Sequence, residues 1–434
     1  MSDVLLRRGW CPGALRPMET GDGLLVRIRP SGGVISSGVA RILAECAEEF
    51  GNGLLDLSSR ANLQIRGVSE SGYPLLITRL RSVGLIDADE WVEASRNIIM
   101  SPLGGIDPTG LIDARGLVAG LELKLKKFNQ ISEIPSKFGF SIDDGGLYSL
   151  HLEGADIRLE VVTSRTGEHR IALGLNGSAL VATSSIGHVV DDAMRLVGAF
   201  LSLKGTCSEP VRRMAHLVAA IGAEKIFEVA GLETRIQTNA FVRQVPKTLG
   251  FRSVQGLEFL GVGVPFGRLN TSNLRFLSEL AELSPFAELR LTPWRTILVP
   301  GLCEDAGGIL LASRAGEFIL DHDDPLLSVA SCPGAPACKN GSTPTQEDAR
   351  SLSKLARDLM TSGTVLHVSG CRKGCAKSSD SEVTLVGRDG RYDLVLAGRA
   401  MDLPAQLGMT LDDVKHTLRV LVAAKRGEDK KADR

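Results

Sequence analysis

The stretch that runs from LLVRIRPSGG at residues 24–33 to DLSSRANLQIRG at 56–67 decides the fold, because it occurs twice. The second copy runs from EFLGVGVPFG at 258–267 to LRLTPWRTILVPG at 289–301, at a constant offset of 234 residues. Each copy reads strand, turn, helix, strand, strand. We interpret this as a duplication that builds a pseudo-two-fold body, with a ligand cleft between its lobes.

The helix of the first copy carries an apolar stripe at i, i+3, i+4, i+7 and i+11, which is typical of a helix with one buried face. The stripe consists of Val39, Ile42, Leu43, Cys46 and Phe50. Leucines stand in the second copy where Leu43 and Cys46 stand in the first. We therefore predict that Cys46 is a core residue and not a metal ligand.

Four cysteines stand as two close pairs near the end of the chain. Cys332 and Cys338 lie in SCPGAPAC (331–338), and Cys371 and Cys375 lie in SGCRKGC (369–375). A cubane cluster takes one thiolate per iron, and glycine-rich loops can fold closely around it. The pairs predict a 4Fe-4S cluster on these four residues; the alternative is four buried thiols without metal.

Length, charge and cysteine usage narrow the class of protein. A chain of 434 residues is expected to form two or more lobes, and a net charge of −1 argues against nucleic acid as the main partner. No apolar run is long enough to span a membrane, and we see no export signal. The other cysteines, Cys11, Cys46, Cys207 and Cys303, form no disulfide framework, so we expect a cytoplasmic protein.

Several motifs carry a family resemblance over nearly the whole chain. They are SSRANLQIRG (58–67), SRNIIMSPLGGIDP (95–108), IPSKFG (134–139) and the two cysteine pairs. Together they resemble the sirohaem nitrite and sulfite reductase superfamily. Within it, RRGWCPGALRPMETGDGLLVRIRP (7–30), KFGFSIDDGG (137–146) and the segment 366–400 are similar to the precorrin-3B synthases.

The resemblance implies an α+β fold, a duplicated reductase-like body with two ferredoxin-like half-domains and two α/β domains around a pseudo-two-fold axis. The half-domains are expected at 1–90 and 236–304. A cluster-free α/β domain is expected at 91–235, the cluster-carrying one at 305–424, and a disordered tail at 425–434. SPLGG at 101–105 matches SCPGAP of the cluster loop, and GGLYSLHLEG (145–154) echoes DGRYDLVLAG (389–398).

Two departures from the reductases weaken the case for reduction of a small anion. Where reductases have K-x-K or K-x-N after the IP turn, Lys137 is followed by Gly139, which has no side-chain donor. Their second cysteine pair usually reads CPNGC, whereas this chain has CRKGC. A sirohaem nitrite or sulfite reductase stays open as an alternative, and so does a non-enzymatic iron-sulfur sensor, which would not need the duplicated body.

The resemblance also implies a tetrapyrrole substrate, precorrin-3A, whose many carboxylates require basic side chains. Arg60, Arg96 and Lys137 match basic residues on the active-site face of the reductases. Asn62 and Gln64 follow Arg60 at even spacing, so all three could share one sheet face. Arg27 and Arg29 alternate similarly, but we expect them to be solvated surface charges.

The implied reaction is oxygen-dependent hydroxylation of precorrin-3A at carbon 20, with a γ-lactone formed from the ring A acetate, in cobalamin biosynthesis. Such a monooxygenase would use dioxygen, the 4Fe-4S cluster and a mononuclear non-haem iron; sirohaem belongs to the alternative. Electrons would come from NAD(P)H through a separate reductase, because no G-x-G-x-x-G motif follows a predicted strand.

The ligands of the mononuclear iron are not evident in the sequence. A facial triad needs two histidines and a carboxylate, and the seven histidines are scattered along the chain. His322 lies within DHDD (321–324), which we interpret as a loop or helix start with solvated carboxylates. His367 precedes the SGC motif and could reach the cluster, although a lone histidine on an apolar strand is more often part of the core.

Overall fold

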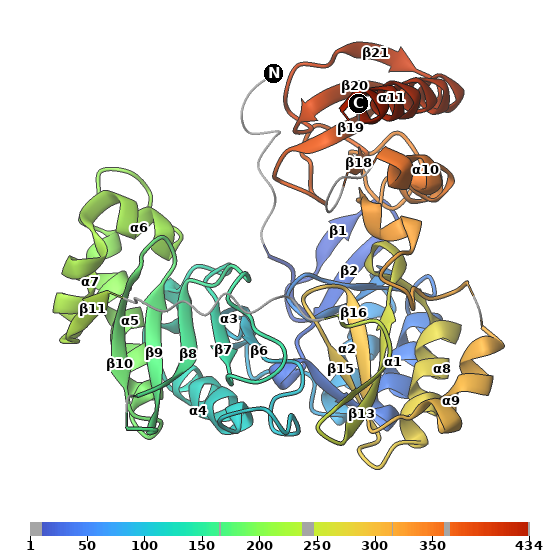
Figure 1. The fold of residues 1–434 in the computed structure, drawn as a ribbon. Coiled ribbons are helices and arrows are strands. Elements are labelled where there is room, and N and C mark those ends of the chain that lie inside the picture. Colours follow the sequence, from blue (N-terminus) through green and yellow to red (C-terminus); the bar gives the residue numbers. More distant parts are fainter. Residues whose placement is uncertain (1–10, 165, 237–246, 315, 360–364, 433–434) are drawn as a thin grey trace.

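The structure is a computed structural model that describes residues 11–164, 166–236, 247–314, 316–359 and 365–432. Within these residues four sheets carry the fold, and helices cover them (Figure 1). The α+β class agrees with the prediction. The parts of the predicted domains at 1–10, 165, 237–246, 315, 360–364 and 433–434 lie outside the described residues. No helix among the described residues is long and apolar enough to cross a bilayer.

The two copies of the repeat form two antiparallel sheets that exchange an edge strand. The first sheet has the order β1 (Met18–Thr20), β2 (Gly23–Ile28), β5 (Leu63–Val68), β4 (Leu54–Leu57), β14 (Arg268–Asn270). The second has the order β12 (Gly250–Val254), β13 (Leu257–Gly263), β16 (Thr296–Pro300), β15 (Glu288–Leu291), β3 (Val34–Ser36). Because β14 pairs with β4 and β3 pairs with β15, each copy completes the sheet of the other.

The backbone repeats at the predicted offset. Ala61 has φ 53° and Arg295, its counterpart 234 residues later, has φ 59°. Gly32 and Phe266, which hold the equivalent turn before the exchanged strand, have φ 59° and 57°. Left-handed conformations are uncommon for residues other than glycine, so their recurrence at matched positions indicates one duplicated unit.

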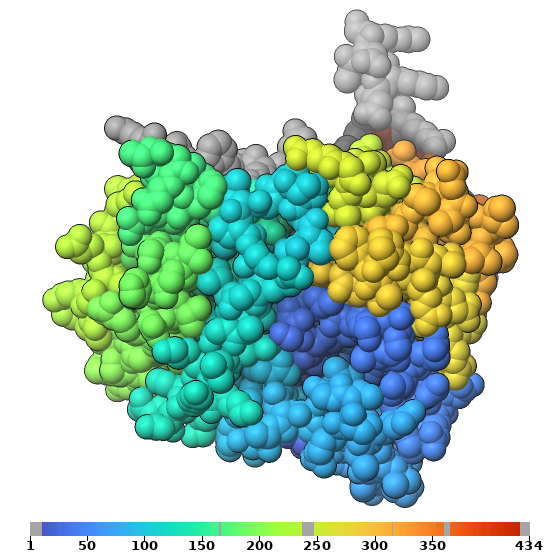
Figure 2. All heavy atoms as spheres, turned by 90° about the horizontal axis from the view of Figure 1, so that it is seen from below, coloured from blue at the N-terminus to red at the C-terminus, as the bar shows by residue number. Residues whose placement is uncertain are grey.

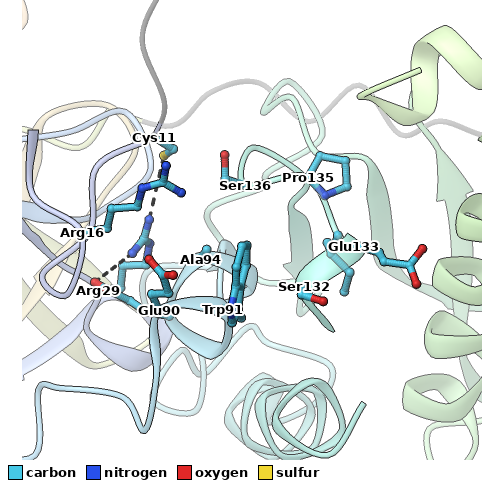
Figure 3. Close-up of a pocket in the computed structure, with 13 residues that line it drawn as sticks. Cys11, Arg16, Arg29, Glu90, Trp91, Ala94, Ser132, Glu133, Pro135 and Ser136 are labelled. Carbon is cyan, nitrogen blue, oxygen red and sulfur yellow. Dashed lines mark hydrogen bonds and ion pairs between the residues drawn. The ribbon is translucent and has the colours of Figure 1, made fainter. Parts of the chain in front are cut away.

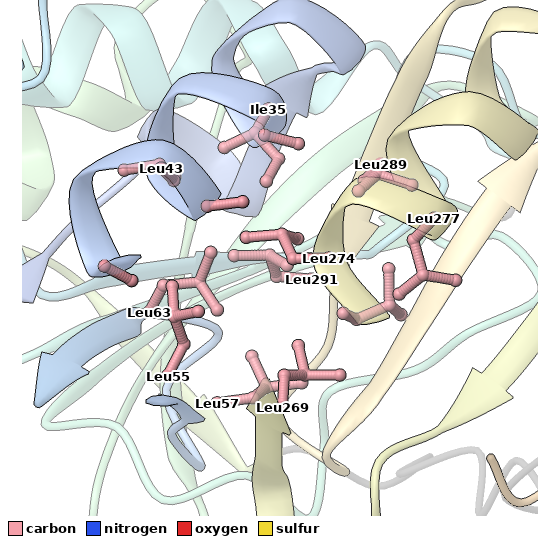
Figure 4. Packing of buried hydrophobic residues seen from close by; sticks show 14 of the residues in the cluster. Ile35, Leu43, Leu55, Leu57, Leu63, Leu269, Leu274, Leu277, Leu289 and Leu291 are labelled. Carbon is pink, nitrogen blue, oxygen red and sulfur yellow. The ribbon is translucent and has the colours of Figure 1, made fainter. Parts of the chain in front are cut away.

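The two copies share one hydrophobic core between helices α1 (Ser37–Glu49) and α8 (Thr271–Glu282) (Figure 4). Leu43 and Leu277 occupy equivalent places in it, as do Leu55 and Leu289. Cys46 is 1% exposed within the same core, and burial raises the pKa of its thiol to about 11. The prediction that Cys46 is a core residue is confirmed.

The first α/β domain contains a mixed sheet flanked by helices, on the left in Figure 1. Its strand order is β11 (Thr234–Ile236), β10 (Leu180–Ser184), β9 (His169–Leu175), β8 (Ile157–Thr163), β7 (Phe140–Asp143), β6 (Ile98–Met100). Its helices are α3 (Glu90–Ser95), α4 (Ala114–Lys126), α5 (Val189–Lys204), α6 (Met214–Ile221) and α7 (Ala223–Ala230). Figure 2 shows this domain, in teal and green, lying against the blue and yellow segments of the duplicated body.

The second α/β domain has a sheet of the same design. Its order is β17 (Val329–Ser331), β18 (Leu366–Ser369), β19 (Ser381–Arg388), β20 (Arg391–Gly398), β21 (Gln406–Met409). In both domains the first three strands are parallel and the later ones antiparallel. Helices α10 (Thr345–Leu359) and α11 (Leu411–Ala432) pack on this sheet, whereas α2 (Tyr73–Ser82) and α9 (Glu304–Ala312) belong to the duplicated body.

Two details of the sequence interpretation need correction. Residues 389–398 form the turn before β20 and the strand itself, whereas 145–154 lie in the connection between β7 and β8, so their similarity does not mark equivalent places. The tail expected at 425–434 continues as helix α11 through Ala432. The lysines, arginine, glutamate and alanine of residues 425–432 are good helix formers, which favours this continuation. The domain boundaries remain our proposal.

Candidate functional site

A cavity of about 610 Å³ lies where the sheet that contains β2 and β5, the first α/β domain and the cysteine loops meet. All four paired cysteines line it, which confirms that the fold brings the two pairs together. The opposite walls are rich in cationic side chains. The charged and polar residues that matter below are Cys11, Arg27, Arg60, Gln64, Arg66, Lys137 and Arg213.

The cysteine loops follow the ends of two parallel strands. Cys332 comes directly after β17 and accepts the backbone N–H of Gly370, which follows β18, at 3.1 Å. Burial raises the pKa of Cys371, so its thiolate needs a cation or a metal to stabilise it. Cys375 is the most exposed of the four.

Glycines allow these loops to pack closely. A β-carbon on Gly334, which has φ +64°, would lie 2.3 Å from the Oγ1 of Thr345. A β-carbon on Gly370 would lie 3.2 Å and 3.3 Å from the Cα atoms of Gly341 and Gly334. Only residues without a side chain fit at this junction, as expected for loops that enclose a compact group.

A buried arginine joins the cysteine loop to the sheet below it. Arg66 on β5 is 2% exposed and donates to the carbonyl of Ala337 at 2.8 Å. It also pairs with Asp22 at 2.8 Å and with Asp56 at 2.9 Å. Burial alone lowers the pKa of Arg66, but these two carboxylates outweigh it and hold the pKa above its usual value. Arg66 is therefore neutralised and acts as a structural link.

The four cysteines fit a cubane cluster. A cubane gives each thiolate a different iron atom, so its ligands stand around a group and not around one ion. No three His, Cys, Asp or Glu side chains converge on a single metal position among the residues described. The same observation does not fit a mononuclear iron. His322, the histidine of DHDD, already accepts the backbone N–H of Leu249 at 3.1 Å.

Arg60 reaches the cavity from the turn between β4 and β5. Its Nη2 donates to the carbonyl of Gly154 at 3.2 Å, and its buried Nη1 has no hydrogen-bond partner among the described residues. A β-carbon on Gly139 would stand 2.9 Å from this Nη1. Burial lowers the pKa of Arg60, and the nearby Arg213 adds to the effect. The absent side chain at 139 thus makes room for a guanidinium group.

Arg27 lines the cavity and is not the solvated surface charge that we expected. Its Nε and Nη2 donate to the Oε1 of Gln64 at 3.0 and 2.6 Å, and its Nη1 donates to the Sγ of Cys11 at 2.9 Å. Burial lowers its pKa. Gln64 is in the cavity as predicted, and its oxygen orients Arg27.

Two further cations lie on the side of the first α/β domain. Lys137 lines the cavity as predicted and is exposed. Arg213 pairs with Asp156, a fully buried carboxylate that also accepts the backbone N–H groups of Gly139 at 2.9 Å and Met214 at 2.8 Å. Asp156 therefore fixes the Gly139 segment and neutralises Arg213.

Three cations of the cavity have no carboxylate partner in the part of the chain that the structure describes. They are Arg27, Arg60 and Lys137. Uncompensated positive charge in a partly buried cavity favours an anionic ligand, and a guanidinium group is suited to carboxylates. The cavity can therefore bind a polycarboxylate beside the cysteines.

The structure does not bring Arg96 and Asn62 to the cavity. Arg96 pairs with Asp87 at 2.8 Å and Glu122 at 2.9 Å, and it donates to the carbonyl of Arg29. Asn62 is buried in the turn before β5, where the left-handed Ala61 breaks the strand alternation that we extended from Gln64. Neither of these two predicted residues lines the cavity.

A second cavity of about 260 Å³ adjoins the first at Cys11 (Figure 3). Arg29 lies in its wall, 3% exposed, and pairs with Glu93 at 3.0 Å. Glu93 also accepts the backbone N–H of Leu15 at 2.9 Å. Arg29 is thus neither solvated, as we expected, nor available to an anion.

Sequence reasoning missed Arg66, Arg213 and Cys11 as residues of the site. Arg66 follows Gln64 at even spacing on β5, so the alternation could have identified it. Arg213 comes from a helix start far along the chain, and no local pattern connects it to Lys137.

Comparison with known proteins agrees with this geometry. Residues 16–83 and 252–306 match the nitrite/sulfite reductase ferredoxin-like half domain, which are the two copies of the repeat. The NirA protein of Mycobacterium tuberculosis has a similar fold, with a TM-score of 0.72 over 92% of this chain and 81% of that chain at 20% identity. The fold is therefore that of the nitrite and sulfite reductases, as predicted.

Relatives that are similar in sequence show which family within this superfamily the chain belongs to. A ferredoxin–nitrite reductase of Leptolyngbya laminosa is 27% identical over 96% of this chain and 89% of its own length. A precorrin-3B synthase of Sinorhizobium sp is 31% identical over 92% of this chain and 85% of its own length. The chain belongs to the precorrin-3B synthase family, within the nitrite and sulfite reductase superfamily.

Proposed function

We propose that this chain is a precorrin-3B synthase, an enzyme that hydroxylates precorrin-3A at carbon 20 and closes a γ-lactone from the ring A acetate. The similarity to the Sinorhizobium synthase supports this activity, and so does a cavity with unpaired cations beside four cysteines. The reaction takes one dioxygen, two electrons and two protons. One oxygen atom enters the substrate at carbon 20 and the other leaves as water.

The three cations without carboxylate partners would bind the substrate. Arg27 and Arg60 lie in the cavity wall with guanidinium groups that can bind carboxylates through two hydrogen bonds, and Lys137 adds a point charge. The acetate and propionate groups of precorrin-3A supply the complementary charge. Gln64 takes part through Arg27, because its oxygen accepts two hydrogen bonds from that guanidinium group.

The cysteines at 332, 338, 371 and 375 would hold a 4Fe-4S cluster, which supplies electrons one at a time when bound. The protein contributes the glycine-rich loops and the Arg66 link that hold the cysteines against the substrate cavity. We derive no step through a mononuclear iron, because the described residues offer no ligand set for it. The electrons would come from NAD(P)H through a separate reductase in the cytoplasm.

The contact between Gly139 and Arg60 is the observation that favours a precorrin-3B synthase over a sirohaem reductase. Reductases resembling this chain have a side-chain donor at the position of Gly139. Here any side chain would meet the guanidinium group of Arg60, since a β-carbon would already stand 2.9 Å from Nη1. The space that a side chain at position 139 would take is occupied by the guanidinium group of Arg60, which is suited to binding a carboxylate.

An absorption spectrum and a turnover assay test the proposal. Anaerobically purified protein should show the broad absorption of a cluster without the intense bands of sirohaem. It should consume precorrin-3A when given dioxygen and a reductant, and should leave nitrite and sulfite unchanged. Sirohaem bands together with nitrite or sulfite reduction would replace the proposal by the alternative, a sirohaem reductase.

A further inference from the structure

His367 is a buried side chain that does not line the cavity of about 610 Å³. It lies on β18 between Leu366 and Val368, whose side chains belong to the core with α10. Because side chains alternate along a strand, His367 lies on the opposite face, together with Ser369. Ser369 lines the cavity with the four cysteines. His367 is therefore on the face of the sheet that the cysteine loops cover.

The imidazole of His367 has no polar partner among the described residues. The residue is 0% exposed, and neither ring nitrogen makes a hydrogen bond. Burial lowers its pKa to about 4, so the ring is neutral at pH 7, with one N–H donor and one acceptor nitrogen. A buried polar group without a partner is unfavourable. Such a ring implies a partner outside the protein chain.

The loop above His367 is the one that carries Cys371 and Cys375. Gly374 in this loop has φ +57°, and a β-carbon on it would lie 3.7 Å from the Cε1 of His367. The same β-carbon would lie 3.2 Å from the Cβ of Ala400, so the loop packs against the turn that follows β20 as well as against His367. The ring thus lies beneath the segment between two of the proposed cluster ligands.

The cluster-free domain offers an internal comparison. Ala330 pairs with His367 in the register of β17 and β18, and Ile99 pairs with Ser141 at the same place in β6 and β7. The equivalent of His367 is thus Ser141, a small residue. The imidazole occurs only in the copy that has the cysteines.

We propose that His367 donates its ring N–H to a sulfur atom of the 4Fe-4S cluster, and that this hydrogen bond raises the reduction potential of the cluster. The inference rests on the cluster of the proposed function. A hydrogen bond to a cluster sulfur stabilises the reduced state, which carries one more negative charge, and so eases electron uptake. His367 acts through the cluster and not on the substrate.

Spectroscopy of the unaltered protein gives the first test. Protein grown with ¹⁵N-histidine, reduced and studied by pulsed electron paramagnetic resonance, should show a weakly coupled histidine nitrogen. The His367→Gln protein, labelled in the same way, should lack it. A coupling that persists in this variant, or that is absent from the wild type, would overturn the inference. A ring that binds only a buried water would give that negative result.

The midpoint potential of the cluster gives the second test. His367→Phe removes the donor and should make reduction about tenfold less favourable, a shift of about 59 mV to more negative potential for a one-electron couple. His367→Asn and His367→Gln keep an N–H at the places of Nδ1 and Nε2, so one of them should restore part of the shift. Equal potentials in the wild type and all three variants would contradict the inference.

The control separates this inference from the proposed function. Wild-type protein should contain four irons and four labile sulfides per chain. A lower content with no cluster signal would overturn the cluster itself. A full cluster whose potential does not respond to position 367 would overturn only the role of His367.

Discussion

Ser101 holds in the first α/β domain the position that Cys332 holds in the second. The Oγ of Ser101 accepts the backbone N–H of Asp144 at 3.1 Å, and the Sγ of Cys332 accepts that of Gly370 at 3.1 Å. The strands before them have the same parallel register. The two domains thus keep the same loop framework, although only the second has cysteines in these loops.

Carboxylates occupy the loops of the cluster-free domain. Asp107 bonds its backbone N–H to Leu103, as Cys338 does to Gly334, so Asp107 stands in place of Cys338. Its Oδ2 accepts the N–H of Leu147 at 2.6 Å, and the Oδ1 of Asp144 accepts that of Gly146 at 2.9 Å. In the cluster-free domain, side-chain oxygens accept hydrogen bonds from the backbone N–H groups of the loops. In the second α/β domain, the sulfur atoms of a cluster can accept the equivalent hydrogen bonds.

Asp144 should give the protein a measurable pH dependence of stability. Burial raises its pKa to about 6, above the value of about 3.9 expected in the unfolded chain. Between these values the folded chain binds more protons, so the free energy of unfolding falls as pH rises from about 4 to 6. Asp144→Asn should remove this part of the slope in denaturant titrations. The exposed Asp412→Asn is the control, and an unchanged slope in Asp144→Asn would disprove the assignment.

The cluster assignment predicts unequal effects of cysteine substitutions. Cys338→Ser and Cys371→Ser should lose most iron and labile sulfide from anaerobically purified protein, because each removes the thiolate of one iron. Cys46→Ala should keep both, since Cys46 is a core residue. Full iron content in the first two variants, or its loss in the third, would refute the assignment.

Arg60 and Gly139 should act as a coupled pair in substrate binding. Arg60→Ala should weaken precorrin-3A binding by about 1.5 to 3 kcal/mol, the range for hydrogen bonds to charged groups. Gly139→Ala should weaken it as well, because the new β-carbon displaces Nη1. The double variant should lose no more than Arg60→Ala, as expected for residues in contact.

A matched glycine controls this experiment. Gly154 lies beside Arg60, but a β-carbon on it would meet nothing within 4 Å. Gly154→Ala should therefore keep its affinity for the substrate, and all variants should keep the absorption of the cluster. Additive losses in the Arg60 and Gly139 variants would show that the two residues act separately.

Arg96 should stabilise the fold and should not bind the substrate. Arg96→Ala leaves the carboxylates of Asp87 and Glu122 without their partner, so the free energy of unfolding should fall by roughly 2 to 4 kcal/mol while substrate affinity is kept. The exposed pair of Arg79 and Glu45 is the control, and Arg79→Ala should cost at most about 1 kcal/mol. Loss of affinity without loss of stability would return Arg96 to the binding site.

The sequence was sufficient to predict those parts of the fold that depend on a local pattern of residues. The apolar stripe from Val39 to Phe50 predicted a helix with one buried face, and α1 spans Ser37–Glu49. A local side chain also sets the start of α4: Asp113 accepts the backbone N–H of Arg115 at 3.0 Å, and the helix begins at Ala114. The exchange of β3 and β14 could not be predicted, since nothing within a strand specifies which copy it joins.

The site was harder to predict because residues far apart in the sequence determine which of its charged side chains form ion pairs. Arg96 and Arg60 look alike in the sequence, but Arg96 pairs with two carboxylates and Arg60 pairs with none of those that the structure describes. Arg27 looked like a surface residue until Cys11 and Gln64 were found beside it. The grouping of the four cysteines at one cavity was predictable because they stand as two close pairs in the sequence.

Labelled dioxygen tests the central claim most directly. Anaerobically purified protein would receive precorrin-3A, a reductant and ¹⁸O₂, and the product would be examined by mass spectrometry and nuclear magnetic resonance. The proposed function predicts one labelled oxygen atom, at carbon 20, and none from labelled water, because the lactone oxygens come from the acetate already present. Label that arrives from water, or a substrate left unchanged while nitrite or sulfite is reduced, would contradict it.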